Sequence, residues 1–340
     1  MLDTLPAQTL KRVKFSKSLT KITGNDNDGI AVDFDDGSSE GPFDLVVGCD
    51  GVNSAVKEYV ANGSIPETGR KGNQALYSGI RIRYAIQDEN VSTPGEEGVT
   101  LAQYFGNGAY ALAGVYGGGK GRSPTKCAFT IYLDEDYFGP FRKKVANRAT
   151  GLKDENADWS QDNRKGTGEM MLEQIEECGV PDKDIRPIIQ ESNRFFELGV
   201  YLHSPFSFNG WRKEVPGSGG MFCTLGGDAA HAMPPFLGQG SNQAIQDAYC
   251  LAKKIFEYNK ELADGNAESD FGSVLKSYEK VRWAPTTSIT AKAALLGYLE
   301  ASTGFIAKFR DVFFFTLGSI GVAKKIFLGA AVPNVGEDES

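Results

Sequence analysis

Apolar and polar positions follow two different patterns along the chain, and each pattern occupies its own stretches. Residues 30–34 alternate between apolar and polar or small side chains, which is typical of a half-buried strand. Residues 43–48 and 221–226 have unbroken apolar centres, which predict two strands that are buried on both faces and share one sheet. Residues 12–19 are expected to form another strand, and residues 54–60 a short helix.

The middle of the chain carries several short strand patterns that are separated by glycine-rich turns. They predict an antiparallel sheet, an architecture different from that of the buried strands on either side of it. The expected strands are residues 80–86, 101–105, 109–116, 127–133 and 195–203, with helices at residues 169–178 and 181–193. A domain inserted in this way places a cleft at the junction of the two architectures, where ligands commonly bind.

The last part of the chain is predicted to be helical. Apolar residues at positions 244–255 recur on one stripe, which indicates an amphipathic helix that begins near Ser241 or Asn242. The pattern after it is again helical, with an expected break at Pro285. The longest apolar stretch, residues 312–323, is too short to span a bilayer. It either packs on the core of the protein or makes peripheral contact with a membrane as an interfacial helix.

Composition excludes several classes of function. The chain has 340 residues, with 36 lysines and arginines against 44 acidic residues, and a formal net charge of −8. No basic stripe stands out, so nucleic acid is not an expected partner. Two histidines and five scattered cysteines without a CxxC pair predict no metal site and indicate reduced thiols. We therefore expect an intracellular protein, soluble or peripheral, and the start of the sequence shows no signal-peptide pattern.

Two segments carry candidate chemistry, and each begins where a predicted buried strand ends. In the first segment, Asp50 and Gly51 form a tight turn that brings the backbone close to a ligand. Ser54 suits the N-cap of the helix that follows. Taken alone, this segment is typical of any strand–turn–helix junction.

The second segment covers residues 226–247. Asp228 leaves the buried strand, where its carboxylate can accept hydrogen bonds from the hydroxyls of a ligand. Two consecutive prolines stiffen the turn, and the glycines at 238 and 240 let the main chain pass against a flat group. The helix that follows points free N–H groups and its positive end at the turn, which predicts a site for an anion. An ordinary capped helix would not explain so many prolines and glycines in one turn.

Both segments resemble motifs of one protein family. Residues 45–56 resemble the DG motif, and residues 227–248 the GD motif, of FAD-dependent aromatic hydroxylases and related epoxidases, the para-hydroxybenzoate hydroxylase-like flavoprotein monooxygenases. Residues 278–282 resemble the helical region of that family. The resemblance implies an α/β fold, in which a Rossmann-like FAD- and NAD(P)-binding domain carries an inserted antiparallel substrate domain and a C-terminal helical region. The expected domains are residues 1–65 and 207–262 for the two FAD-binding parts, 66–206 for the substrate domain, and 263–340 for the C-terminal helices and an acidic tail.

The resemblance also implies a reaction. FAD is held noncovalently and is reduced by NAD(P)H, and O2 then adds to give a flavin C4a-hydroperoxide. One oxygen atom passes from it to an aromatic or unsaturated small molecule, such as a phenol or a polyene. Negative charge grows at one edge of the flavin on reduction, and a helix N-terminus stabilises it there.

Site residues carry over from the family position by position. Asp228 would bind the ribityl or pyrophosphate side of FAD, and Asp50 with Gly51 would stand between FAD and the route of the nicotinamide. Pro234 or Pro235, the expected catalytic positions, would lie over the flavin ring near the substrate. The backbone that would face the pyrimidine edge of the flavin comprises Leu237, Gly238, Gln239, Gly240, Ser241 and Asn242.

The candidate substrate contacts are mostly aromatic. Phe236, beside the prolines, would touch the substrate or the flavin. Tyr77 and Tyr104 of the antiparallel layer would either line the cleft or serve as core aromatics. Arg81 and Arg83 belong to the same layer, but a solvated strand face is the favoured interpretation for them.

His231, within the second segment, has two alternative roles. It is expected to be a packed, hydrogen-bonded member of its turn, and general-base catalysis is the weaker alternative.

One expected unit is missing from the sequence. Chains of the family normally open with a strand, a G-x-G-x-x-G turn and a helix that hold the FAD pyrophosphate. Residues 106–111 fit G-x-G-x-x-A, but strands flank them on both sides, so they are expected to form a hairpin turn. We therefore expect a chain truncated at its N-terminus, which binds FAD weakly or not at all by itself.

Several alternatives to this interpretation stay open. The chain can be a degenerate, non-catalytic paralogue that binds a hydrophobic ligand or a protein partner. A separate chain can supply the missing half. A flavin-dependent reductase or halogenase would keep the flavin and change the chemistry, although the turn at residues 233–240 favours a hydroxylase-type pocket.

Overall fold

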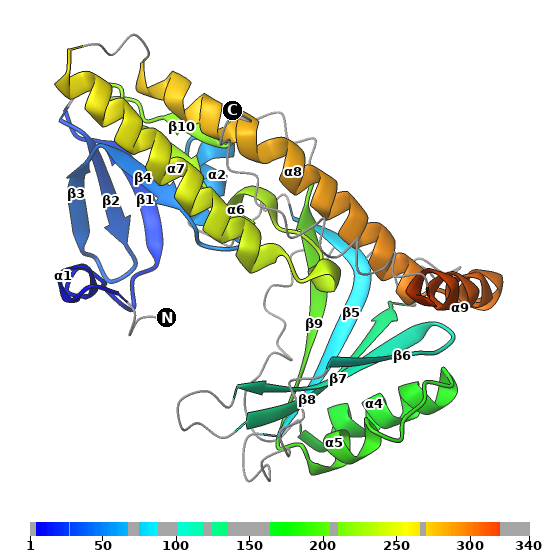
Figure 1. Cartoon of the computed structure of the whole chain (residues 1–340). Helices are drawn as coiled ribbons and strands as arrows, with labels where there is room; N and C mark the ends of the chain where they lie inside the picture. The colour runs from blue at the N-terminus through cyan, green and yellow to red at the C-terminus, as the bar shows by residue number, and fades with distance from the viewer. Residues whose placement is uncertain are drawn as a thin grey trace. The chain divides into compact units, whose positions relative to one another are not determined.

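The computed structural model describes residues 5–26, 28–66, 75–87, 101–117, 124–134, 164–204, 210–265 and 270–319. These residues belong to two compact units, each assembled from separate stretches of the chain (Figure 1). Unit 1 comprises Met1–Asn73, Phe206–Ala230 and Asp247–Val281, and unit 2 comprises Gln74–Pro205, His231–Gln246 and Arg282–Ser340. The domain boundaries expected from the sequence stay a prediction.

The described residues of unit 1 form two three-stranded sheets. The first is an antiparallel meander of β1 (Leu19–Gly24), β2 (Ile30–Phe34) and β3 (Ser39–Phe43). The second has the order β10 (Arg212–Glu214), β11 (Phe222–Leu225), β4 (Leu45–Gly48). Strands β4 and β11 run parallel to one another, which confirms that the two apolar strands share a sheet.

The prediction of a strand at residues 12–19 is wrong. The short helix α1 (Ala7–Leu10) comes before this stretch, and the first strand begins only at Leu19. The reason is the length of the partner strand: β2 ends at Phe34, which pairs with Leu19, so residues 12–18 have no paired residue on β2.

The prediction that β4 is buried on both faces is also wrong. Helix α2 (Ala55–Asn62) packs on one face, where a Cβ on Gly48 would lie only 2.5 Å from the Cβ of Val56. Successive side chains of a strand point to opposite faces, and Val47 on the other face is 40% exposed. That face borders a groove of about 680 Å³, which Asp50 also lines.

Unit 2 is built on a five-stranded sheet. Its order is β6 (Leu101–Phe105), β7 (Ala109–Gly117), β8 (Pro124–Leu133), β5 (Ala75–Gln87), β9 (Arg194–His203). Every neighbouring pair is antiparallel, which confirms the predicted sheet. Strands β6 and β7 form a tight hairpin in which the N–H of Gly106 donates to the carbonyl of Ala109 at 2.9 Å, as expected for the G-x-G-x-x-A stretch.

The two faces of this sheet have different partners. Helices α4 (Arg164–Glu177) and α5 (Arg186–Glu191) cover one face, where they pack on a layer of alanines from β5, β7 and β8 (Figure 1). Side chains alternate along each strand, so Tyr110 and Ile131 point to the other face. That second face forms the candidate site of unit 2.

The remaining helices follow β11. They are α6 (Asp228–His231), the 3-10 turn η4 (Pro235–Leu237), α7 (Gly240–Ala263), α8 (Phe271–Glu300) and α9 (Gly304–Ser319). The predicted break at Pro285 is wrong, because α8 continues through it (Figure 1). Proline removes only one N–H from this helix, and the next turn is held by the hydroxyl of Thr286, which donates to the carbonyl of Arg282 at 2.8 Å.

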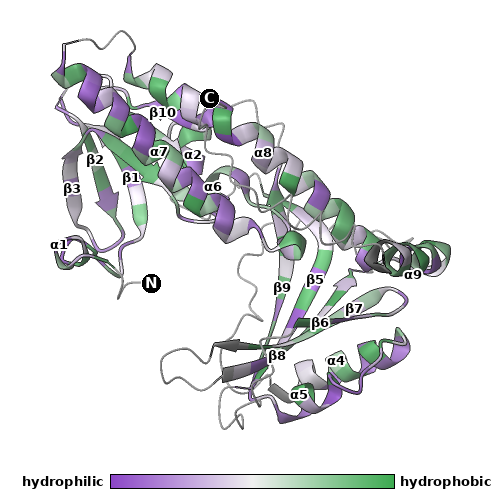
Figure 2. Cartoon of the chain, viewed as in Figure 1, coloured by the Kyte–Doolittle hydropathy of each residue, from purple (hydrophilic) through white to green (hydrophobic). Residues whose placement is uncertain are grey.

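No helix among the described residues combines the length and apolar character that crossing a membrane requires. Helix α9 carries apolar residues (Figure 2), and several of their side chains, including Phe305 and Phe315, are nevertheless exposed. Peripheral membrane contact by this part of the chain stays a prediction.

Candidate functional site

The turn after β4 caps the helix that follows it. The carboxylate of Asp50 accepts hydrogen bonds from the hydroxyl of Ser54 and from the N–H of Ala55, the latter at 2.6 Å. The hydroxyl oxygen of Ser54 accepts from the N–H of Lys57 at 2.8 Å, as its predicted N-cap role requires. Gly51 has a φ of 81°, a conformation that glycine adopts without strain. The candidate residue Asp50 therefore has a local structural role at this helix N-terminus.

A buried lysine connects this helix with the second segment. The Nζ of Lys57 donates to the carbonyls of Ala229 and Ala230, at 3.2 and 3.4 Å. Burial lowers the pKa of Lys57 to about 8. The two carbonyls follow Asp228 directly, so Lys57 fixes the position of α6 within unit 1. Sequence reasoning missed this residue, because nothing in the local pattern distinguishes it from a surface lysine.

The turns after β4 and β11 lie at the same edge of the sheet. The two strands end as neighbours, since Leu225 pairs with Gly48. The N–H of Gly227 donates to the buried carboxylate of Asp247 at 2.8 Å, which ties the turn to α7. Asp228 is exposed just beyond this turn. Ligands of parallel sheets commonly bind at the carboxyl ends of the strands, and this edge presents such ends.

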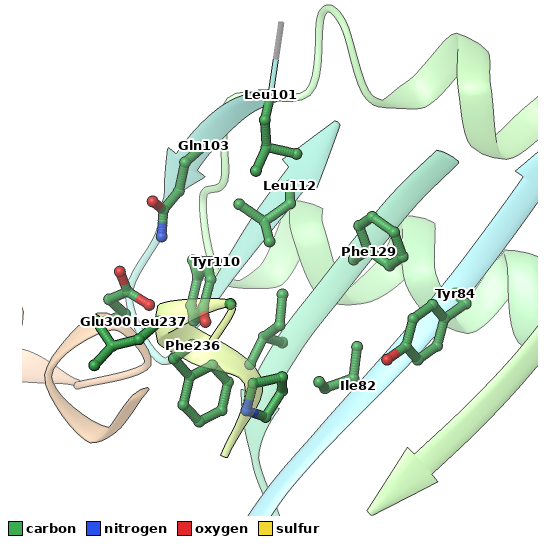
Figure 3. Close-up of a pocket in the computed structure, with 13 residues that line it drawn as sticks. Ile82, Tyr84, Leu101, Gln103, Tyr110, Leu112, Phe129, Phe236, Leu237 and Glu300 are labelled. Atoms are coloured by element: carbon green, nitrogen blue, oxygen red, sulfur yellow. The ribbon is translucent and has the colours of Figure 1, made fainter. Parts of the chain in front are cut away.

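In unit 2, the residues after Pro234 form one wall of a cavity of about 440 Å³ (Figure 3). Such a volume is within the range of about 300–1,000 Å³ that is typical of small-molecule sites. The lining residues are Pro235, Phe236, Leu237 and Gly238 from this wall, Ile82, Tyr84, Leu101, Gln103, Tyr110, Leu112, Phe129 and Ile131 from the sheet, and Glu300 from α8. Pro234 is itself buried and does not line the cavity.

Glu300 is the acidic member of this lining. Its side chain is buried, and burial raises its pKa to about 7, although hydrogen bonds from Gln103 and Tyr110 and the charge of Arg310 favour ionisation. Sequence reasoning missed Glu300. The signal that could have found it is its position as the one charged residue in the apolar stretch 293–307.

A buried arginine holds the start of α7 in place through hydrogen bonds. The guanidinium of Arg282 donates to the side-chain oxygens of Gln243 and Gln246, at 2.6 and 3.0 Å, and to the carbonyl of Gln243 at 3.3 Å. Ser241 and Asn242 of the same turn are exposed. The first turn of α7 is therefore exposed at a helix end that Arg282 holds in place, and the first N–H groups of a helix have no partner within the helix.

Two of the predicted substrate contacts lie elsewhere in unit 2. The hydroxyl of Tyr77 donates to Asp134 at 2.7 Å, and that of Tyr104 donates to Asp184 at 2.6 Å. Neither tyrosine belongs to the cavity lining. Their role as substrate contacts stays a prediction.

Arg81 and Arg83 are not on a solvated face, contrary to the sequence-based interpretation. Both form ion pairs with Glu197, and their side chains are only 17% and 14% exposed. The opposing carboxylate comes from β9, a strand distant in sequence, so the local pattern could not reveal it. His231 is buried, as expected for a packed member of its turn.

Three comparisons bear on the family. A protein-family model described as an FAD binding domain matches residues 206–292. An FAD-dependent monooxygenase of Gibberella moniliformis is 25% identical over 276 residues, which cover 80% of this chain and 54% of that protein. The chloroplastic zeaxanthin epoxidase of Arabidopsis thaliana is 27% identical over 331 residues, which cover 89% of this chain and 42% of that protein. The chain is similar in sequence to an FAD-dependent monooxygenase and to zeaxanthin epoxidases.

One solved structure is similar to this chain in fold. Klebsiella pneumoniae HpxO, complexed with FAD and uric acid, has a TM-score of 0.60 at 20% identity, over 94% of this chain and 66% of that one. The chain spans about half the length of the curated relatives it matches. The matched FAD-binding segment includes Asp228, the turn that lines the cavity, the start of α7 and Arg282.

Proposed function

We propose that this protein is an FAD-dependent monooxygenase that uses NAD(P)H and O2 to insert one oxygen atom into an aromatic or unsaturated small molecule. One observation in unit 2 carries the proposal. The exposed residues Gly238, Ser241 and Asn242 follow directly on the turn that lines the apolar cavity. Residues suited to hold a cofactor and residues suited to hold its substrate are thus continuous in sequence.

The residues present fit FAD. A Cβ on Gly238 would meet no atom within 4 Å, so the backbone there borders open space. Ser241 and Asn242 lie in the first turn of α7, where free N–H groups and the positive helix end stabilise negative charge. Asp228 is exposed and can accept hydrogen bonds from hydroxyl groups.

Bound FAD would supply electrons taken from a reduced nicotinamide and the means to activate O2. The residues of the chain supply binding, orientation and exclusion of water. Asp228 would bind the ribityl or pyrophosphate side of the cofactor, and the backbone of residues 237–242 would bind the pyrimidine edge. Pro235 and Phe236, together with the apolar sheet residues, would keep water from the bound substrate.

The activities of the similar proteins support this class of reaction. The similar proteins and structures include an FAD-dependent monooxygenase, a zeaxanthin epoxidase and a structure with FAD and uric acid, so small molecules are the expected substrates. Together with O2 and NAD(P)H, these are the partners that we propose for this protein.

FAD binding tests the first part of the proposal. The wild-type chain and Asp228→Ala are titrated with FAD, and the change in flavin fluorescence is measured. FAD is supplied in excess. We expect Asp228→Ala to bind about tenfold less tightly, the loss of one charge-assisted hydrogen bond. Asp264→Ala, an exposed carboxylate just beyond the end of α7, is the matched control and binds as wild type does.

Isotope labelling tests the second part. Oxidation of NAD(P)H in the presence of FAD, labelled O2 and an oxidisable ligand yields a product that carries one labelled oxygen atom. A product without the label would assign a flavin-dependent reductase or halogenase. Binding of FAD by the wild-type chain without oxidation of NAD(P)H or of the ligand would overturn the proposal and support the non-catalytic alternative.

A further inference from the structure

The polar groups of the unit 2 cavity are concentrated at one end. Figure 3 shows Glu300, Gln103 and Tyr110 close to one another, next to Leu237. Most of the remaining lining is apolar, and Tyr84 brings the other hydroxyl group. A ligand in this cavity therefore meets hydrogen-bonding groups at one end and hydrocarbon along most of its length.

Glu300 is held in place from three elements. Gln103 of β6 and Tyr110 of β7 hydrogen-bond to its carboxyl group. Arg310 of α9 donates to the main-chain carbonyl of Glu300 at 2.6 Å and to the carbonyl of Gly106 at 2.9 Å. These contacts leave a buried carboxyl group at the cavity wall with its orientation fixed.

The lining carries no counter-charge to this carboxylate. None of the cavity-lining residues in the described part of the chain is a lysine, arginine or histidine. Arg310 is buried behind Glu300, and its guanidinium is engaged by the carboxylate of Asp311 at 2.7 Å as well as by the two carbonyls. An anionic ligand would find a like charge at the polar end of the cavity, at a cost that burial increases.

We propose that Glu300 sets the charge specificity of this cavity: it accepts a hydrogen bond from the hydroxyl or N–H of an uncharged aromatic ligand and excludes ligands that carry a carboxylate. The assignment of this ligand as the substrate rests on the proposed monooxygenase function, whereas the binding preference does not. Because a carboxylate can only accept hydrogen bonds, the selected ligand must bring the donor. Because the pKa of Glu300 is raised to about 7, its carboxyl group ionises, and this preference strengthens, as the pH rises through the neutral range.

Three probes with the same ring system test the proposal without FAD. Binding of 2-naphthol, naphthalene and 2-naphthoate to the wild-type chain is measured by fluorescence titration at about pH 8, where Glu300 is mostly ionised. We expect 2-naphthol to bind at least about tenfold more tightly than naphthalene, as one hydrogen bond to a charged group provides. We expect 2-naphthoate to bind more weakly than naphthalene. At about pH 6 the preference for 2-naphthol becomes smaller.

Substitutions of Glu300 distinguish the effect of its charge from the effect of its shape on ligand binding. Glu300→Gln removes the charge and keeps an acceptor, so 2-naphthoate gains affinity at least about fivefold while 2-naphthol keeps part of its preference. Glu300→Leu abolishes the preference for 2-naphthol over naphthalene. Glu176→Gln, an exposed carboxylate on α4, behaves as wild type does in all three titrations. The wild-type comparison of the three probes stands even if a variant fails to fold.

Two results would overturn the inference: 2-naphthoate binding to wild type as tightly as 2-naphthol, or Glu300→Leu retaining the preference. The failure of this inference differs from that of the proposed function. If the probes bind as expected but the chain with FAD bound oxidises neither NAD(P)H nor a ligand, the proposed function fails and the cavity assignment stands. If FAD binds and labelled oxygen is incorporated while the probes show no dependence on Glu300, the cavity assignment fails and the proposed function stands.

Discussion

Gly297 of α8 lies against the ring of Phe236, so closely that a Cβ on Gly297 would be 2.2 Å from the Cε2 atom of that ring. The missing side chain lets the last turn of α8 pack on the turn η4. Phe236 and Glu300, three residues after Gly297, both line the cavity. The close approach of α8 and η4 therefore fixes the distance between Phe236 and Glu300 in the cavity wall.

Gly297→Ala should destabilise unit 2 and disturb the cavity. The added methyl group forces Phe236 to move, because the ring has no room to stay in place. We expect the free energy of unfolding to fall by about 2 kcal/mol, a typical cost of overpacking, although alanine is the better helix former. Urea denaturation measures the loss. Titration with 2-naphthol should show weaker binding as the ring shifts.

Gly166→Ala is the matched control for this change. Gly166 also lies in a helix, α4, but no atom is within 4 Å of a Cβ placed there. Alanine should raise the free energy of unfolding there by up to about 1 kcal/mol, through helix propensity alone. If Gly297→Ala stabilised the protein in the same way, the contact with Phe236 would not constrain the site.

Arg282→Met should loosen the first turns of α7. The substitution removes hydrogen bonds to Gln243 and Gln246 and leaves their buried oxygens without this donor. We expect a loss of about 3 kcal/mol in the free energy of unfolding, as for other buried charged groups. If the proposed function is correct, FAD affinity falls as well, since the N–H groups of this helix end are no longer held.

Arg186→Met is the control for removing an arginine. Arg186 pairs with Asp182 on a side chain that is 37% exposed, so its loss should change the free energy of unfolding by less than about 1 kcal/mol. Equal effects of the two substitutions in urea denaturation would contradict the role assigned to Arg282.

The sequence was informative where the chemistry is local. That β4 and β11 share a sheet followed from two apolar runs, and the antiparallel sheet followed from alternation within each strand. Capping by Ser54 likewise depends on residues within one turn. The errors concern tertiary context. The helix continues through Pro285 because flanking contacts hold it, and Val47 is exposed because α2 covers only one face of its strand.

The candidate site was predictable only in part, for the same reason. The turn at residues 235–238 lines a cavity, and its prolines and glycines indicated a special turn. Lys57 and Arg282 could not be predicted as members of the site, because each acts on a group distant in sequence, whereas Glu300 is marked only as the one charged residue of an apolar stretch. Lys57, for example, donates to a carbonyl 172 positions further on. The spacing of residues within one segment does not indicate contacts with residues that are distant in sequence.

Lys57→Met should weaken the attachment of α6. Methionine keeps the apolar stem of lysine but leaves the carbonyls of Ala229 and Ala230 without this donor. We expect the free energy of unfolding to fall by about 1–3 kcal/mol, measured by urea denaturation. Lys280→Met, an exposed lysine on α8, is the control and should be nearly neutral. An equally small effect at both positions would show that Lys57 does not hold this turn.

The stability of the protein should depend on pH through Glu300. Burial raises the pKa of Glu300 from 4.5 to about 7, so between these values the folded state holds a proton that the unfolded state has lost. The free energy of unfolding of wild type, relative to Glu300→Gln, should therefore be highest near pH 4.5 and should decrease as the pH rises to about 7. The total decrease is at most about 3 kcal/mol, from 1.36 kcal/mol for each unit of pKa. Urea denaturation at several pH values measures the difference, and subtraction of the variant removes the contributions of other titrating groups. Glu176→Gln should show no such trend, because its carboxylate is exposed. A difference between wild type and Glu300→Gln that stays constant from about pH 5 to about pH 8 would show that Glu300 ionises as freely in the folded chain as in water.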